Sequence, residues 1–181
     1  MEDTVVRAGS SFTDKDGITA KVLEVIAHKD YNNATLDNDI ALMRLDRSVT
    51  GLNGGKIIQM TSQDKSIATG QIVRVSGWGL TSYSNVYSYE PLGTVEITVT
   101  DHATCNTAYN GLDHTITDNM ICARSLGKDA CSMDSGGPMV IDEKELVGVV
   151  SHGYECAMED FPGVFTKVAN YRKWIKDNSG I

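Results

Sequence analysis

The chain has 181 residues, of which 41% are hydrophobic, so it is long and apolar enough for one or two domains with a core. Its formal net charge of −8 argues against nucleic acids and anionic membrane surfaces as partners, because both are polyanions. No apolar run approaches the length that a bilayer crossing needs, and acids after Met1 give no signal-peptide pattern.

Most of the chain alternates apolar and polar residues with a period of two, between turns rich in Gly, Asn and Asp. This pattern predicts half-buried strands. The clearest examples, in chain order, are residues 20–26, 71–75, 93–99 and 145–150.

Two helices are predicted among these strands. The first begins after an N-cap at Asp101 and runs to about Tyr109. The second spans about residues 169–177, where Tyr171, Trp174 and Ile175 are spaced to form one apolar face. Residues 82–90, rich in Ser and Tyr, are predicted to form an exposed loop.

Metal sites are weakly supported by the sequence. Residues 14–17, Asp-Lys-Asp-Gly, begin like a calcium loop but lack the later ligands and the closing Glu of an EF-hand. The four cysteines have no C-x-x-C spacing of a zinc site, and they permit three disulfide pairings. We therefore expect no metal and no cofactor.

The most informative stretch is Met133-Asp134-Ser135-Gly136-Gly137-Pro138. Small neighbours leave the Ser135 hydroxyl exposed on a tight turn, and the glycines let a carbonyl substrate approach the backbone closely. The alternative is an ordinary glycine-rich turn, since Ser-Gly-Gly is a common triplet. The longer run from Lys128 to Pro138, KDACSMDSGGP, favours a nucleophile.

That run resembles the nucleophile segment of the chymotrypsin/trypsin-like serine proteases. Three other parts of the chain resemble the family in matching order: NDIALMRL at 38–45, VSGWG at 75–79, and VSHG at 150–153 with PGVFT at 162–166. The resemblance extends from about Val5 to Ile175. Details such as TDNMIC at 117–122 look most like mite and other arthropod members.

The resemblance implies an all-β fold of two antiparallel six-stranded barrels with a C-terminal helix. We expect one protease domain over residues 1–178, with the first barrel incomplete. In this division about 1–61 is the remnant of the first barrel, about 70–166 is the second barrel, and about 167–178 is the helix.

The resemblance also assigns Ser135 as the nucleophile and Asp39 as the acid that orients the base. A serine hydroxyl needs such a base, usually histidine. The family carries it in an Ala-Ala-His-Cys motif, which these 181 residues do not contain. The four histidines have other contexts: His28 is expected to be structural, His102 and His114 to be solvated, and His152 to lie at the substrate cleft.

Asp134 is the acid that, in the family, pairs with a new N-terminus released by zymogen cleavage. The Ile-Val-Gly-Gly-like sequence of that terminus is also absent here. A buried carboxylate without this partner must find another cation, become protonated or turn into water. We therefore expect the chain to be a fragment or a truncated form.

Three substitutions predict an altered or partly blocked cleft. The oxyanion hole would use the backbone N–H groups of Met133 and Ser135, although the family usually has glycine at the first position. Methionine keeps the N–H, but its side chain is expected to crowd the leaving-group side. His152 replaces a tryptophan of the cleft floor, and Glu155 stands where a glycine usually forms the pocket rim.

Asp129, six residues before Ser135, matches the pocket acid that pairs with substrate Lys or Arg. A buried acid selects a long cation because the cation compensates its desolvation. Gly153 and Gly163 match the small pocket walls, next to Ser151 and His152 in the substrate cleft. The alternative is that Asp129 is a solvated loop acid beside Lys128.

The resemblance selects two disulfides, Cys105–Cys122 and Cys131–Cys156. Disulfides indicate an oxidising environment, so the protein is expected to be secreted and extracellular.

Two functions follow. The first is an endopeptidase that cleaves after Lys or Arg through an acyl-enzyme, with protein or peptide substrates, protease inhibitors as further partners, and a monomeric state when complete. The second is a catalytically inactive paralogue that acts as a binding module. Met133, His152, Glu155 and the missing front part of the domain favour the binding module, whereas the retained nucleophile, orienting acid and pocket acid favour the enzyme.

Overall fold

The computed structural model describes residues 4–51, 55–80, 91–112, 115–125, 132–154 and 160–181. These parts of the chain hold the strands β1 (Val5–Ala8), β2 (Ile18–Ala27), β3 (Ala41–Leu45), β4 (Gln59–Met60), β5 (Ile72–Gly77), β6 (Gly93–Thr100), β7 (Met120–Arg124), β8 (Pro138–Ile141), β9 (Glu145–His152) and β10 (Gly163–Lys167). The helical elements are α1 (His102–Ala108), the 3-10 turn η1 (Val168–Tyr171) and α2 (Arg172–Ser179).

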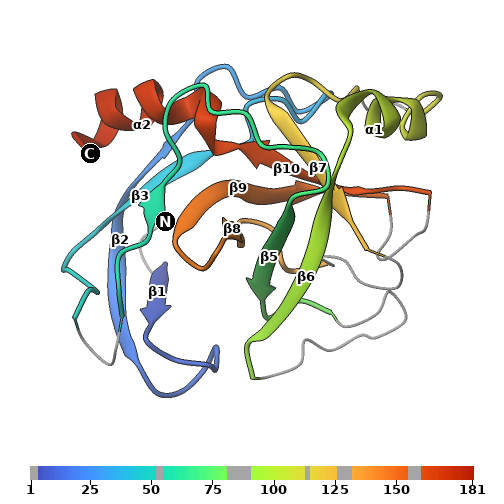
Figure 1. Ribbon diagram of the computed structural model, residues 1–181. Helices are drawn as coiled ribbons and strands as arrows, with labels where there is room; N and C mark the ends of the chain where they lie inside the picture. The colour runs from blue at the N-terminus through green and yellow to red at the C-terminus, as the bar shows by residue number, and fades with distance from the viewer. Residues whose placement is uncertain (1–3, 52–54, 81–90, 113–114, 126–131, 155–159) are drawn as a thin grey trace.

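Six strands form a closed antiparallel barrel. Its strand order is β10-β7-β6-β5-β8-β9, and β9 pairs back with β10 to close the ring. The short β4 runs parallel to β9 outside this ring (Figure 1). The alternation of side chains explains which residues fill the interior of the barrel. In β5, Val73 and Val75 are buried, whereas Ile72, the first residue of the strand, is 60% exposed. Closure gives every strand two neighbours and leaves no free edge within the ring.

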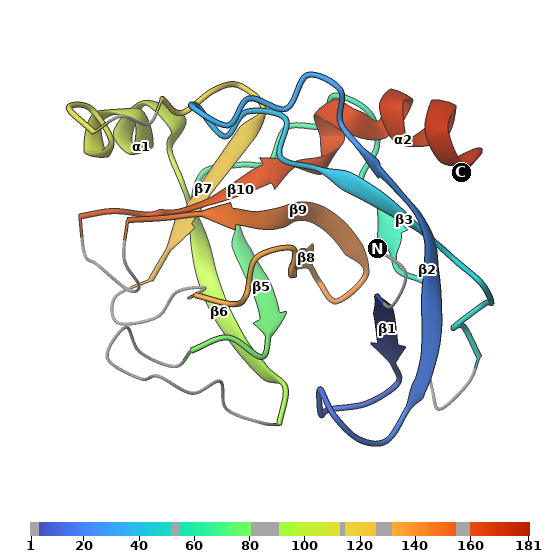
Figure 2. The same ribbon diagram turned by 180° about the vertical axis from the view of Figure 1, so that it is seen from behind.

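The remaining strands, β1, β2 and β3, form a separate antiparallel sheet in that order. Both views show this sheet beside the barrel, below the C-terminal helix (Figures 1 and 2). Its apolar side chains are less covered than those of the barrel: Val5, Leu23 and Met43 are each more than half exposed.

These elements confirm the predicted fold class, a mostly-β molecule with a closed six-stranded barrel, a further sheet and a C-terminal helix. The four strands expected from alternation lie in β2, β5, β6 and β9. Asp101 is the N-cap of α1, because its carboxylate accepts a hydrogen bond from the Thr104 backbone N–H at 2.9 Å. The second helix begins one residue early, as the 3-10 turn η1. The predicted loop at 82–90 lies outside the described residues.

The apolar face of the second helix is confirmed as well. Tyr171 and Ile175 are buried, and Trp174 packs against their cluster. Neither α1 nor α2, the two α-helices of the described ranges, has the length and apolarity that crossing a membrane requires.

Polar contacts join the segment before β3 to the barrel. The Asp37 carboxylate accepts hydrogen bonds from Thr117 Oγ1 at 2.7 Å and Asn119 Nδ2 at 3.1 Å. Nearby, Tyr171 Oη donates to Asn38 Oδ1 at 3.1 Å. Burial raises the pKa of the Tyr171 hydroxyl well above its usual range, and the charge of Asp37 adds to this effect. The phenol therefore stays a neutral donor at this junction.

The loop between β1 and β2 is organised by the guanidinium of Arg7. Arg7 donates to the carbonyl oxygens of Thr13, Asp14 and Asp16, at 2.9, 3.1 and 2.5 Å. The segment that begins like a calcium loop thus lies around a side-chain cation.

Candidate active site

Ser135 lies on a turn that β9 holds in place. Gly136 has a φ of +83°, which glycine adopts at little cost, and its N–H donates to the Val150 carbonyl at 2.9 Å. The Val150 N–H donates in return to the Gly137 carbonyl at 2.9 Å. Ser135 itself is exposed, so its hydroxyl is open to an approaching substrate.

The Asp134 carboxylate lies against the residues that follow β5. Its Oδ1 accepts a hydrogen bond from the Gly79 N–H at 2.8 Å. A Cβ at Gly79 would lie 2.5 Å from Asp134 Cγ, so the carboxylate fits only because this residue is glycine. The Leu80 N–H also donates to the Ser132 carbonyl, at 2.9 Å. The half-buried Asp134 thus has a backbone donor, a partner that the sequence did not suggest.

Met133 has a left-handed backbone conformation, with a φ of +75°. This region favours glycine and costs other residues free energy. A glycine, which the family usually has here, would adopt this conformation at little cost. The Met133 side chain is 69% exposed. Its expected crowding of the leaving group stays a prediction.

Asp39 lies two residues before β3 and is hydrogen-bonded to two strands of the barrel. Ser151 Oγ, on β9, donates to Asp39 Oδ2 at 2.7 Å. Thr166 Oγ1, on β10, donates to the Asp39 carbonyl at 2.6 Å. The expected place of Ser151 in the substrate cleft stays a prediction. In the structure its hydroxyl is hydrogen-bonded to the Asp39 carboxylate.

Asp39 and Ser135 line one cavity of about 680 Å³. Most of the other lining side chains are apolar, among them Ala27, Ile40, Ala41, Met43 and Val149. No histidine is among the residues that line it in the described ranges. The fold thus brings the predicted nucleophile and orienting acid to one site.

The histidines lie elsewhere. His28 packs against the rings of Tyr171 and Trp174, with centroids 5.5 and 5.0 Å away, as expected of a structural residue. The side chain of His102 is 45% exposed, and its Nε2 lies 3.1 Å from the Thr117 carbonyl oxygen. His102 is thus exposed to solvent, as expected, and has one backbone contact beside the solvent.

Two histidines remain. His152 ends β9, and its Nδ1 lies 3.0 Å from Ser151 Oγ. His114 lies outside the described residues.

The pocket region is described in part. Ser151 and His152 end β9, Gly153 follows them exposed to solvent, and the buried Gly163 begins β10. The expected pocket acid Asp129, the rim residue Glu155, and the expected disulfide between Cys131 and Cys156 lie outside the described residues.

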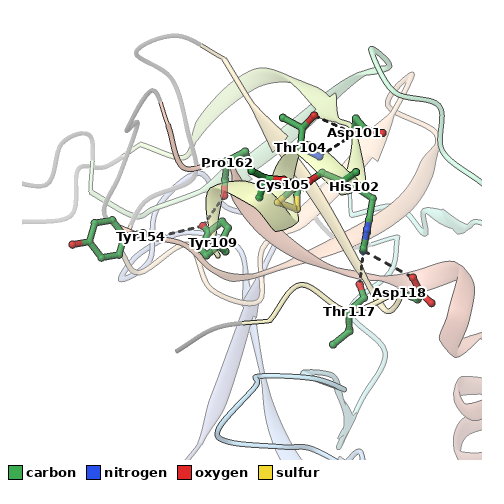
Figure 3. Close-up of a disulfide and its surroundings, with 12 residues drawn as sticks. Asp101, His102, Thr104, Cys105, Tyr109, Thr117, Asp118, Tyr154 and Pro162 are labelled. Atoms are coloured by element: carbon green, nitrogen blue, oxygen red, sulfur yellow. Dashed lines mark hydrogen bonds and ion pairs between the residues drawn. A yellow bond between two sulfur atoms is a disulfide. The ribbon is translucent and has the colours of Figure 1, made fainter. Parts of the chain in front are cut away.

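The disulfide Cys105–Cys122 is present and joins α1 to β7 (Figure 3). Next to it, Tyr109 Oη donates to the Pro162 carbonyl at 2.7 Å and accepts from the Tyr154 N–H at 3.3 Å. Tyr109 thus ties the end of α1 to residues at both ends of the segment between β9 and β10. Sequence reasoning missed this role, because a tyrosine closing a helix carries no local signal for partners that lie about 50 residues away.

The model of the family described as Trypsin matches residues 1–175. The chain belongs to the trypsin family. This trypsin-family chain is 40% identical to Trypsin beta of Drosophila erecta over 174 residues, which are 96% of the chain and 68% of that protein. It is also 40% identical to Trypsin Blo t 3 of the mite Blomia tropicalis over 164 residues, 88% of the chain and 61% of that protein.

A third relative, alkaline trypsin C of Manduca sexta, is 37% identical over 177 residues, which are 96% of the chain and 68% of that protein. The resemblance to mite and other arthropod members is therefore confirmed. The trypsin-family chain spans about two thirds of the length of these relatives.

Proposed function

We propose that the chain carries the nucleophile and the orienting acid of a secreted trypsin-like serine endopeptidase that cleaves proteins after Lys or Arg. The observation that carries the proposal is the shared cavity of Asp39 and Ser135, which come from distant parts of the sequence. Ser135 Oγ would attack the scissile carbonyl, and the N–H groups of Met133 and Ser135 would stabilise the oxyanion. The base would take the Ser135 proton and pass it to the leaving amine as the C–N bond breaks, and water would then hydrolyse the acyl-enzyme. One protease domain over residues 1–178 is part of the same proposal.

The base would be a histidine that reaches the cavity from sequence beyond these 181 residues. Three features support this. The cavity lies against both Asp39 and Ser135, its other lining is mostly apolar, and Ser151 already orients the carboxylate that such a histidine would need. Without the base, the proposal predicts only residual reactivity for the chain alone.

Reaction of Ser135 with a fluorophosphonate, with and without free imidazole, tests this proposal on the chain as it is. We expect slow labelling alone and a saturable acceleration by imidazole, because the small base can enter the cavity beside Asp39. Ser135→Ala should abolish labelling, whereas the matched Ser132→Ala variant should not.

Two results would contradict it. Labelling at trypsin-like rates without imidazole would show that the chain supplies its own base. No labelling under either condition would support the inactive paralogue.

The inactive binding module remains the second candidate because of Met133. A left-handed methionine with a 69% exposed side chain stands at the expected oxyanion hole. The loss of one oxyanion donor costs roughly a hundred- to a thousand-fold in rate. If Met133 impairs the hole, Met133→Gly should raise the imidazole-assisted labelling rate. If something other than Met133 makes the chain inactive, Met133→Gly will be labelled as slowly as the unmodified chain.

The preference for Lys and Arg rests on the match of Asp129 to the pocket acid and on the small residue Gly163 at the start of β10. Benzamidine, a flat amidinium, probes that pocket without any catalytic step. We expect it to bind and to lose most of its affinity in Asp129→Ala, but not in the control Asp118→Ala, whose side chain is fully exposed. Equal binding to all three proteins would show that Asp129 is a surface acid.

A further inference from the structure

The last two residues of β9 form a chain of polar contacts that ends at Asp39. Ser151 Oγ donates to Asp39 Oδ2 at 2.7 Å. The same oxygen lies 3.0 Å from His152 Nδ1. Both distances are in the normal range for hydrogen bonds, so one hydroxyl serves two neighbours.

The number of protons in this chain fixes the donor at each contact. A carboxylate only accepts, so the single proton of the Ser151 hydroxyl is used on Asp39. The contact with His152 is then a hydrogen bond only if Nδ1 carries a proton and donates it to Ser151 Oγ. The reverse arrangement would leave Ser151 Oγ and Asp39 Oδ2 at 2.7 Å with no proton between them.

The imidazole of His152 is held where this bond requires it. Its residue pairs with Val164 of β10 in the barrel. The ring of Tyr109 meets the imidazole edge-on at 6.4 Å between centroids. Tyr109 is itself fully buried and bonded to the Pro162 carbonyl. The imidazole of His152 is thus held on one side by its own strand β9, which is paired in the barrel, and on the other by Tyr109 at the end of α1.

We propose that His152 is a positioning residue for Asp39: its Nδ1–H donates to Ser151 and thereby holds the Ser151 hydroxyl on the carboxylate. The neutral Nδ1–H form and the imidazolium both carry this proton, so either state keeps the chain intact. The tryptophan usual at this position in the family has its N–H one bond farther from the backbone and cannot repeat the contact in the same way. The effect on reactivity rests on the proposed function, whereas the proton position does not.

The proton position can be measured on the unmodified chain. Nitrogen-15 NMR of the histidine rings distinguishes a protonated Nδ1 from a protonated Nε2. Above the titration of its ring, His152 should be the Nδ1–H tautomer, with Nε2 unprotonated. A neutral Nε2–H tautomer would overturn the proposal, whatever the reactivity of Ser135.

The positioning effect is tested by two variants of His152. Asparagine places an amide nitrogen three bonds from Cα, as Nδ1 is, and so keeps the donor; leucine removes it. We expect imidazole-assisted labelling of Ser135 to slow about tenfold in His152→Leu, the factor for one lost hydrogen bond, and to stay within about twofold in His152→Asn. The loss should lie in the maximal rate and not in the imidazole concentration for half-maximal effect.

Ser151→Ala supplies the control, since it removes the link between His152 and Asp39. In that background the leucine and asparagine variants should react equally. A tenfold difference that persists there would overturn the positioning role. If Ser135 reacts in none of these proteins, the proposed function fails, and the tautomer alone decides the inference about His152.

Discussion

The closed barrel and the three-stranded sheet share one sequence pattern, yet they bury their apolar side chains to different extents. In the barrel, Val73, Val147 and Phe165 are at most 1% exposed. In the sheet, Leu23 and Met43 are 55% and 56% exposed. The barrel closes on itself, so each inward side chain meets others from the opposite strands. In the sheet, Leu42 of β3 packs only partly buried against the cluster of Val168, Tyr171 and Ile175. Alternation predicts a strand, but the pairing of whole sheets determines burial.

The same substitution, methionine to alanine, can be made in both regions to compare how much buried side chains contribute to stability. Met139 of β8 is fully buried in the barrel, and Met43 of β3 is more than half exposed. Met139→Ala should lower the free energy of unfolding by about 2–5 kcal/mol, because it leaves a cavity in the core. Met43→Ala should change it by less than about 0.5 kcal/mol. Urea denaturation measures both, and equal losses would show that the sheet is buried as deeply as the barrel in solution.

Removal of the Cys105–Cys122 disulfide measures how much this bond adds to the stability of the closed barrel. Cys105 and Cys122 are 17 residues apart, so their joint replacement by alanine should cost about 3 kcal/mol. Hydrogen exchange should accelerate in α1 and β7, which the disulfide joins, and stay unchanged in β1–β3. Equal acceleration in β1–β3 would contradict a separate response of the two regions.

Asp37 tests how strongly the sheet depends on the barrel. Asp37→Ala removes the acceptor of Thr117 and Asn119 at the junction and should cost about 1–2 kcal/mol. Hydrogen exchange should rise in β2 and β3 more than in the barrel. Asp37→Asn keeps one acceptor oxygen and should lose less. If both variants destabilise the barrel and the sheet equally, the two regions unfold as one unit.

The smallest expected effect concerns Glu145, at the start of β9. Hydrogen bonds from Lys65 Nζ, at 2.7 and 2.9 Å, hold the pKa of this carboxyl below its ordinary value of 4.5. A lowered pKa stabilises the fold above pH 4.5, and this contribution is lost as the pH falls through the lower, folded value. Because the pair is partly exposed, it is worth at most about 1 kcal/mol. Thermal unfolding from pH 3 to 6 should show this slope, and Glu145→Gln should remove it.

The sequence predicted those features of the structure that depend on residues close together in the chain. The cap of α1 follows from Asp101 and the helical residues after it, and the fold class from motifs along the chain. The contacts of the candidate site are different. Ser151 reaches Asp39 across 112 positions, and Gly79 reaches Asp134 across 55. Such partners depend on barrel closure, which no local pattern encodes. The resemblance named Ser151 and Asp39 but gave no reason to join them.

The loop between β1 and β2 is ordered by the guanidinium of Arg7, a cation that belongs to the chain and is not taken from solution. A bound ion can be diluted, chelated or exchanged, and the order of its loop then depends on the medium. The cation of Arg7 is covalently part of β1, so its local concentration beside Thr13, Asp14 and Asp16 is fixed by the chain. The same loop provides the Ser11 carbonyl that accepts the Trp78 indole N–H at 2.8 Å, next to the glycine that supports Asp134. This contribution to the order of the loop therefore comes from a cation that dilution or chelation does not remove.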